Sequence, residues 1–208
     1  MYQPSPFVEA DPTILLSLMR ARPLAVVAVN GEDGPQVNHL PLLAVEEEGV
    51  LKLRGHVARA NPLWRLLEDA PQALAVFQGD DAYISPSWYP AKAEHGKVVP
   101  TWNYMVAHAR GRLRAVDDPA WLRGLLDQLT RAGEAGFPQP WQVADAPADY
   151  LAKMLRAIVG IELTVSRLDG KYKLSQNQNE ATRLSVREGL AESGDGRAKG
   201  LAGEMARF

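Results

Sequence analysis

Compact apolar runs separated by turn residues dominate the first half of this chain. Runs of this kind, bounded by Gly, Pro, Asn and Asp, are typical of strands. They predict six strands: Leu24–Asn30, Gln36–Val45, Val50–Gly55, Gln72–Gln78, Ala82–Ser85 and Thr101–Val116. A helix is expected from Asp11-Pro12 to Pro23, and a short one over Pro62–Glu68 with Asn61 as its N-cap. Strands joined by tight turns, with one short helix inserted, favour an antiparallel barrel over a parallel α/β sheet.

The second half of the chain changes to helical periodicity. Apolar spacing predicts one helix that starts at Asp118-Pro119 and a second over Ala148–Ile158, with a Gly- and Pro-rich loop over Gly133–Pro147. The segments expected to follow are a strand over Val159–Leu168, a turn at Asp169-Gly170, an extended Lys171–Leu174 and a polar helix over Asn179–Leu190. We therefore expect a mainly β protein with appended C-terminal helices.

One domain is predicted over residues 1–190. Its barrel core spans about 1–117, a helical insertion about 118–158, and a returning strand and helix about 159–190. From Ala191 onward the chain is Gly, Ala and charge, which indicates a flexible tail over 191–208.

Composition narrows the function classes. Hydrophobic residues make up 46% of the chain and charged residues 23%, which is ordinary for a soluble globular protein. The formal net charge of −2 gives no general reason to expect nucleic-acid or membrane binding. The absence of cysteine excludes disulfides, thiolate metal sites and a cysteine nucleophile. The chain has no secretory signal pattern and no apolar run near the roughly 20 residues that span a bilayer, so a cytoplasmic location is expected.

The stretch from Leu53 to Pro62 contains a candidate anion site. His56, Arg59 and Asn61 are expected on the turn that leads into the short helix, where free backbone N–H groups and the positive helix end collect. A guanidinium such as Arg59 can meet a phosphate bidentately, and His56 and Asn61 can add hydrogen bonds. The plain alternative makes Arg59 a solvated surface residue and His56 a cap of the strand end.

A proline interrupts the strand that contains His39, Leu40, Pro41 and Leu42. Because Pro41 removes one donor of the strand ladder, this segment is expected at an edge or a bulge. A ligand that approaches the interruption could use the backbone groups left free. The alternative is a structural bulge with His39 facing solvent or core.

Aromatic residues cluster downstream of these two segments. The five that lie within 22 residues are Tyr83, Trp88, Tyr89, Trp102 and Tyr104. Flat rings beside a loop suit a planar cofactor or a dimer interface. For any single ring, ordinary core packing is the plain explanation.

Five strings in order along the chain together resemble a known family. They are His39-Leu40-Pro41-Leu42-Leu43, Gly55-His56-Val57-Ala58-Arg59-Ala60-Asn61-Pro62, Ala82–Tyr89, Val99–Tyr104 and Lys173-Leu174-Ser175-Gln176-Asn177. The family is the PaiB type, usually described as FMN-binding negative transcriptional regulators, and the resemblance runs from about Met1 to Leu190. It implies a split β-barrel like that of pyridoxamine-phosphate oxidases and flavin reductases, usually a homodimer with FMN at the subunit interface.

The resemblance places the cofactor on residues that the patterns already single out. The FMN phosphate would meet Arg59, with Asn61 and His56 beside it, and the flavin ring would lie along His39–Leu42. Trp88 and Trp102 are taken as further cofactor-binding rings. The Lys173–Asn177 string is assigned a positioning role, either capping a turn or contacting a partner subunit.

Several functions stay open. The protein is expected to be a cofactor-linked regulator, a repressor that acts directly or indirectly, or else a flavin-dependent oxidoreductase acting on a small molecule. A haem-binding split barrel and a binding module with an empty site are further alternatives. DNA contact would need a basic surface assembled by the dimer, since no helix-turn-helix is present and only Arg110, Arg112 and Arg114 alternate on one strand. Ser85 and Ser87 lack the Gly-x-Ser-x-Gly context of a hydrolase, and the four histidines lack metal-ligand spacing.

Overall fold

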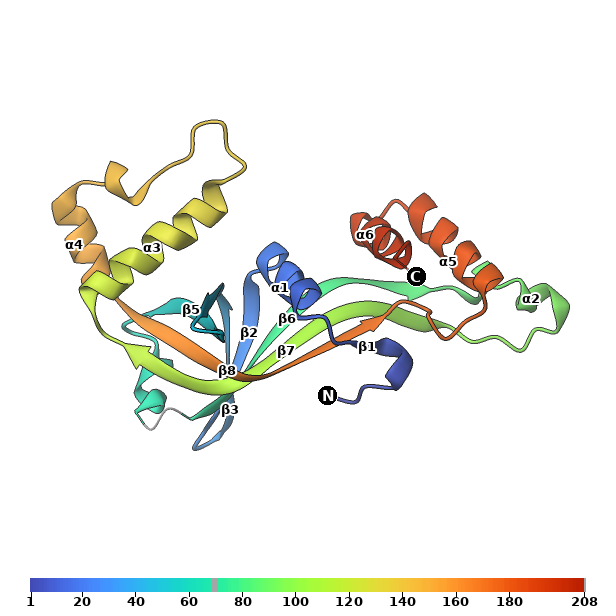
Figure 1. Ribbon diagram of the computed structural model, residues 1–208, viewed down its shortest axis with the longest axis horizontal. Helices are drawn as coiled ribbons and strands as arrows, with labels where there is room; N and C mark the ends of the chain where they lie inside the picture. Colours follow the sequence, from blue (N-terminus) through green and yellow to red (C-terminus); the bar gives the residue numbers. More distant parts are fainter. Residues whose placement is uncertain (69–70, 208) are drawn as a thin grey trace. The chain divides into compact units, whose positions relative to one another are not determined.

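A computed structural model describes residues 1–68 and 71–207 of the chain (Figure 1). Its strands are β1 Val8–Glu9, β2 Leu24–Gly31, β3 Gly34–Pro41, β4 Leu43–Glu47, β5 Val50–Ala58, β6 Gln72–Ile84, β7 Thr101–Val116 and β8 Ile158–Lys173. Its α-helices are α1 Pro12–Ala21, α2 Ala91–Glu94, α3 Pro119–Glu134, α4 Ala148–Arg156, α5 Glu180–Glu192 and α6 Gly196–Met205. Short 3₁₀ helices cover Ser5–Phe7, Pro62–Leu67, Pro86–Trp88 and Val143–Asp145.

The eight strands of the described residues belong to one sheet. Seven of them follow the order β3-β2-β6-β7-β8-β5-β4, and β1 pairs with β8. The strand pairs whose register is defined, β1–β8, β2–β3, β2–β6, β4–β5 and β5–β8, are antiparallel. The mainly antiparallel sheet with appended helices that the sequence predicts is therefore confirmed.

The described residues form two compact units. Residues 19–68, 71–77 and 109–168 make up what we call the barrel unit, and residues 1–18, 78–108 and 169–207 the terminal unit. The long strands β6, β7 and β8 contribute one part to each. The prediction of one domain over residues 1–190 stays a prediction.

The barrel unit contains a seam where the two edge strands of the sheet follow one another in the chain. β3 ends at Pro41 and β4 begins at Leu43, so the sequence predicted as one strand, Gln36–Val45, is in fact two. Leu42 leaves both ladders, donates its N–H to the carbonyl of Pro23 at 2.9 Å, and is 4% exposed. The proline that cannot donate thus marks the place where the chain passes from one edge of the sheet to the other. We call residues 41–43 the seam.

Helix α3 covers one face of the sheet in the barrel unit. Asp118 caps it by accepting hydrogen bonds from the backbone N–H groups of Ala120 and Trp121. The Trp121 ring lies on Gly160 of β8, where a Cβ atom would come within 2.3 Å of it. A side chain at position 160 would therefore lift the helix from the sheet.

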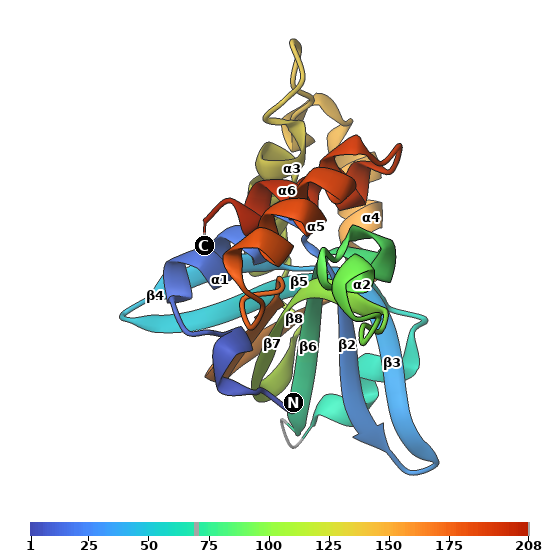
Figure 2. The same cartoon turned by 90° about the vertical axis from the view of Figure 1, so that its right-hand side faces the viewer.

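The terminal unit corrects two sequence predictions. The turn expected at Asp169-Gly170 is absent, because β8 runs on to Lys173 and Gly170 pairs with Glu9 of β1. The flexible tail expected from Ala191 instead contains α6, which lies beside α5 (Figure 2) and buries Leu201 and Met205.

No helix among the described residues has the length and apolar character that a membrane crossing requires.

Candidate functional site

A mostly apolar cavity of about 440 Å³ lies against the seam of the barrel unit. Its sheet side is formed by Pro41, Leu42, Leu43, Ala44 and His56. Its other walls include Leu126, Leu129 and Thr130 of α3, with Arg20 and Pro23. A volume of several hundred Å³, apolar walls and few polar groups are typical of small-molecule sites. We call it the seam cavity.

His56 is the polar group of the seam cavity with an unmet hydrogen-bonding need. It lies inside β5, opposite Gly160 of β8, and not on a turn as predicted. Its Nδ1 atom is buried without a hydrogen-bond partner. Burial lowers the pKa of His56, so the imidazole is neutral at pH 7. A neutral imidazole offers one donor and one acceptor to a ligand.

Arg59 holds the barrel unit together through several hydrogen bonds. Its Nη1 and Nη2 atoms donate to the Asp117 carboxylate at 2.8 and 2.6 Å, and its Nε and Nη2 donate to the carbonyls of Arg156 and Ile158 at 2.8 and 3.0 Å. The hydrogen bond from Arg59 lowers the pKa of Asp117, which stays ionised. Four of the five guanidinium N–H groups are thus engaged. A phosphate at Arg59 would meet one remaining N–H beside a carboxylate, so phosphate binding there stays a prediction that this geometry does not favour.

Asn61 performs the capping role predicted for it. Its side-chain oxygen accepts from the N–H of Leu63 at 2.9 Å, and its Nδ2 donates to Asn38 Oδ1 at 2.8 Å. The helix that follows, Pro62–Leu67, is a 3₁₀ helix of six residues. Such a short element has only a small dipole, so its N-terminal end attracts an anion only weakly.

The other predicted site residues lie outside the seam cavity. His39 is exposed on β3, and Leu40 is 9% exposed on the opposite face. Trp88 and Trp102 belong to the terminal unit. Trp88 packs against Gly189, while Trp102 is 54% exposed and meets Tyr83 edge-to-face with ring centroids 6.1 Å apart. Of the nine predicted cofactor residues, only Pro41, Leu42 and His56 line the cavity.

Two parts of the cavity wall were missed by reading the sequence. Leu126 and Leu129 sit in an α3 stripe that sequence alone assigns to helix packing, and Arg20 ends α1 as an ordinary exposed cation. The sequence signal for Leu126 and Leu129 as cavity residues is the width of the apolar stripe. The stripe also includes Leu122 and Leu125, and it is wider than one buried helix face needs.

The chain is similar to several known proteins. A family model described as "Putative FMN-binding domain" matches residues 1–167. The protease synthase and sporulation protein PAI 2 of Bacillus subtilis is 30% identical, over 97% of this chain and 95% of that protein. An uncharacterized protein of Emericella nidulans is 32% identical with the same coverage.

Solved structures show the same fold. An FAD- and haem-binding protein of Mycobacterium smegmatis matches with a TM-score of 0.63 at 18% identity, covering 86% of this chain and 78% of that one. A flavocytochrome of Azotobacter vinelandii matches with a TM-score of 0.61 at 17% identity, covering 86% of this chain and 75% of that one. The split-barrel fold predicted from the sequence is thus confirmed.

Proposed function

We propose, from the premise that this chain belongs to the PaiB-type family of FMN-binding domains, that the flavin ring occupies the seam cavity. FMN is the cofactor that this membership assigns to the chain. The observation that carries the proposal is a mostly apolar cavity with one orphaned buried nitrogen, His56 Nδ1. An isoalloxazine ring has two apolar faces and a polar edge of carbonyl and N–H groups, which is the complementary pattern.

The residues of the cavity fit the parts of the cofactor. Leu42, Leu126 and Leu129 offer apolar surface to the ring and exclude water from it. His56 can donate to or accept from the ring edge, since its neutral imidazole holds a proton on one nitrogen only. Arg20 supplies a guanidinium to the cavity wall and is exposed, and none of the described residues that line the cavity with it is a carboxylate. We therefore assign the FMN phosphate to Arg20 in preference to Arg59.

The proposed activity is flavin-dependent oxidation or reduction of a small molecule. The bound flavin supplies hydride and electron transfer, so the chain needs no acid, base or nucleophile of its own for that step. The role of the protein is to bind the ring, orient it and keep water away.

A regulatory role is a second candidate, favoured by the sporulation-linked name of the Bacillus subtilis relative. Of the three alternating arginines that could form a basic stripe, Arg114 is paired with Glu162 at 2.7 Å. This strand therefore offers fewer unpaired cations to DNA phosphates than the sequence suggests. We assign any repressor function to a change in the flavin state of the protein, and not to a preformed DNA-binding surface. The absorption spectrum of the isolated protein separates flavin from haem, since haem gives a Soret band.

Leu129→Arg is expected to weaken FMN binding by at least about tenfold. The arginine side chain would occupy part of the apolar cavity. FMN binding would then have to strip water from the guanidinium group and place it against the flavin ring, which costs free energy. Gln128→Arg, one position along α3 at an exposed residue, makes a similar change outside the cavity and should leave the affinity unchanged. Flavin fluorescence titration gives both dissociation constants, and equal values for the two variants would place the ring elsewhere.

Arg20→Met is expected to weaken FMN binding by about tenfold while leaving riboflavin binding unchanged. The variant keeps the apolar stem and removes only the charge that meets the phosphate. Arg59→Met tests the competing assignment in the same titrations. If Arg59→Met removes the preference for FMN over riboflavin and Arg20→Met does not, the phosphate lies at Arg59.

A further inference from the structure

A second cavity, of about 460 Å³, lies within the terminal unit. It is formed where the start of β7, the end of β8 and the start of α5 meet the loop after α2, and most of the residues that line it have polar side chains. Its functional groups come mainly from Lys97, Thr101, Asn103, Lys173, Ser175 and Asn177. Among the described residues that line it, none is acidic and two are lysines. We call it the polar cavity.

Asn103 points to a ligand because it is fully buried and incompletely hydrogen-bonded. The residue is 0% exposed, its Nδ2 donates to Ser175 Oγ at 3.0 Å and to Met205 Sδ at 4.0 Å, and its Oδ1 has no partner. The Ser175 hydroxyl can donate as well as accept, so turning the amide round only exchanges which of its two ends lacks a partner. Buried amide groups without partners are rare in folded proteins. A ligand hydroxyl, which both donates and accepts, would satisfy Asn103 in either orientation.

The Lys173–Asn177 string builds the wall that faces Asn103. Gln176 fastens the turn, accepting from the N–H of Leu174 at 2.7 Å and donating to the carbonyl of Tyr172 at 2.6 Å. Ser175 has a φ of 64°, a left-handed conformation that is uncommon for a residue with a side chain. The turn is thus fastened from within the string, which is the capping role predicted for it, and Ser175 and Lys173 of the string line the polar cavity.

Lys173 supplies one of the two ammonium groups of the cavity. Its ammonium group donates to Thr101 Oγ1 and to the carbonyl of Trp102, which leaves one of its three N–H groups for a ligand. Burial first, and the neighbouring Lys171 second, lower the pKa of Lys173. An anion beside the ammonium group would offset both effects, and no carboxylate among the described lining residues provides one.

We propose that the polar cavity binds a small hydroxylated anion, of the sugar phosphate class, with the anionic group at Lys173 and a hydroxyl at Asn103. One molecule that carries both parts satisfies the unpartnered amide and the cationic lining together. This site does not rest on the flavin proposal, since the seam cavity shares no residue with it.

Calorimetry on the full-length, FMN-loaded protein tests the proposal with three probes. Ribose 5-phosphate carries both groups, inorganic phosphate only the anion, and ribose only the hydroxyls. Ribose 5-phosphate is expected to bind at least about tenfold more tightly than either of the others. Absence of binding, or equal affinity for phosphate alone, overturns the proposal.

Variants locate the binding in the molecule. Lys173→Met should weaken ribose 5-phosphate by at least about tenfold, whereas Lys199→Met, the same change at an exposed residue of α6, should have no effect. Asn103→Leu replaces the incompletely bonded amide with an apolar group of similar size and should abolish binding while the thermal midpoint holds or rises. An unchanged affinity in Lys173→Met contradicts the assignment.

The same measurement separates this proposal from the flavin site. Leu129→Arg is expected to bind FMN at least about tenfold more weakly and to bind ribose 5-phosphate as the wild type does, because it changes only the seam cavity. If FMN instead competes with ribose 5-phosphate, the polar cavity receives the flavin's own ribityl phosphate and a separate ligand is excluded.

Discussion

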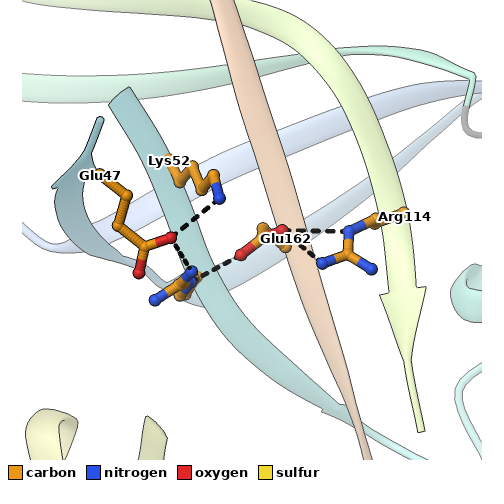
Figure 3. Close-up of polar contacts among 5 residues, drawn as sticks. Glu47, Lys52, Arg114 and Glu162 are labelled. Atoms are coloured by element: carbon orange, nitrogen blue, oxygen red, sulfur yellow. Dashed lines mark hydrogen bonds and ion pairs between the residues drawn. The ribbon is translucent and has the colours of Figure 1, made fainter. Parts of the chain in front are cut away.

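Replacing Glu162 by alanine is expected to lower the free energy of unfolding by roughly 3 kcal/mol. Glu162 lies in β8 and is 2% exposed. Its carboxylate accepts hydrogen bonds at 2.7 Å from Arg54 on one neighbouring strand and from Arg114 on the other (Figure 3). Burial raises the pKa of this carboxyl, but the two arginines outweigh burial and the net pKa is lowered. Removing the carboxylate leaves two guanidinium groups without their shared anion.

The rest of the ion network limits the loss. Arg54 also donates to Glu47 at 2.7 Å, and Lys52 donates to the same carboxylate at 2.8 Å (Figure 3). The Arg54 guanidinium also lies 5.8 Å from the centre of the Trp121 ring. Arg54 therefore keeps partners when Glu162 is removed, and the side chain of Arg114 is 54% exposed and can turn to water. These two facts place the expected value at the low end of the range for broken buried pairs.

Urea denaturation at pH 7 measures the effect, with Glu46→Ala as the matched control. Glu46 is an exposed neighbour in β4, so its removal should change the free energy of unfolding by less than about 0.5 kcal/mol. The pKa of Glu162 is lowered in the folded state, so its contribution is present above the ordinary carboxyl pKa near 4.5 and is lost as pH falls through the folded value. The gap between wild type and Glu162→Ala should therefore narrow in acid. A gap below about 1 kcal/mol at pH 7, or one independent of pH, would contradict the prediction.

Local chemistry accounts for the parts of the fold that the sequence predicts well. β7 has the predicted bounds, Thr101–Val116, and Asn61 caps a short helix as predicted. The helices predicted to start at Asp118 and at Asn179 do start there, and each of these residues caps its helix. A cap depends on groups two or three residues away, and a strand run depends on its own side chains. Both are therefore visible in a short window of sequence.

The predictions that the structure contradicts fail because of interactions between segments that are distant in the sequence. Asp169-Gly170 reads as a turn, yet Gly170 is held extended by pairing with Glu9 and by contact with Leu15, more than 150 residues earlier. α6 has a weak apolar pattern, and the burial of Leu201 and Met205 in the terminal unit orders it. Tertiary contacts of this kind override local propensity.

The residues of the candidate site also divide into those that local sequence reveals and those that depend on distant segments. Pro41 and Leu42 could be selected because an interrupted strand is a local signal. His56 was selected for an expected turn before a helix, but it reaches the cavity from inside β5. Arg59 was equally suited to a phosphate or a carboxylate, and the carboxylate that it binds, Asp117, lies 58 residues further along. Arg20 comes from a helix whose position against the seam no local pattern reveals.

Gly111→Ala is expected to have the largest effect of any single methyl group added to the barrel unit, with a loss above about 4 kcal/mol or failure to fold. Gly111 is buried in β7, which neighbours β8 in the sheet. A Cβ atom there would lie 1.9 Å from the carbonyl oxygen of Thr164 and 2.8 Å from its carbonyl carbon. The obstacle is backbone and not a flexible side chain, so no rotamer change relieves it. The two strands would have to separate, which breaks the sheet at its centre.

Gly124→Ala makes the same chemical change where space is open. Gly124 lies inside α3 and has no atom within 4 Å of an added Cβ, so alanine should raise the free energy of unfolding by about 0.5–1 kcal/mol through helix propensity. The same glycine-to-alanine change is therefore expected to lower the free energy of unfolding at position 111 and to raise it at position 124. Thermal and urea denaturation of the two purified variants measure both changes. If Gly111→Ala folds with a loss below about 1 kcal/mol, β7 and β8 do not approach as closely as this structure has them. In that case glycine at 111 reflects no steric demand of the sheet.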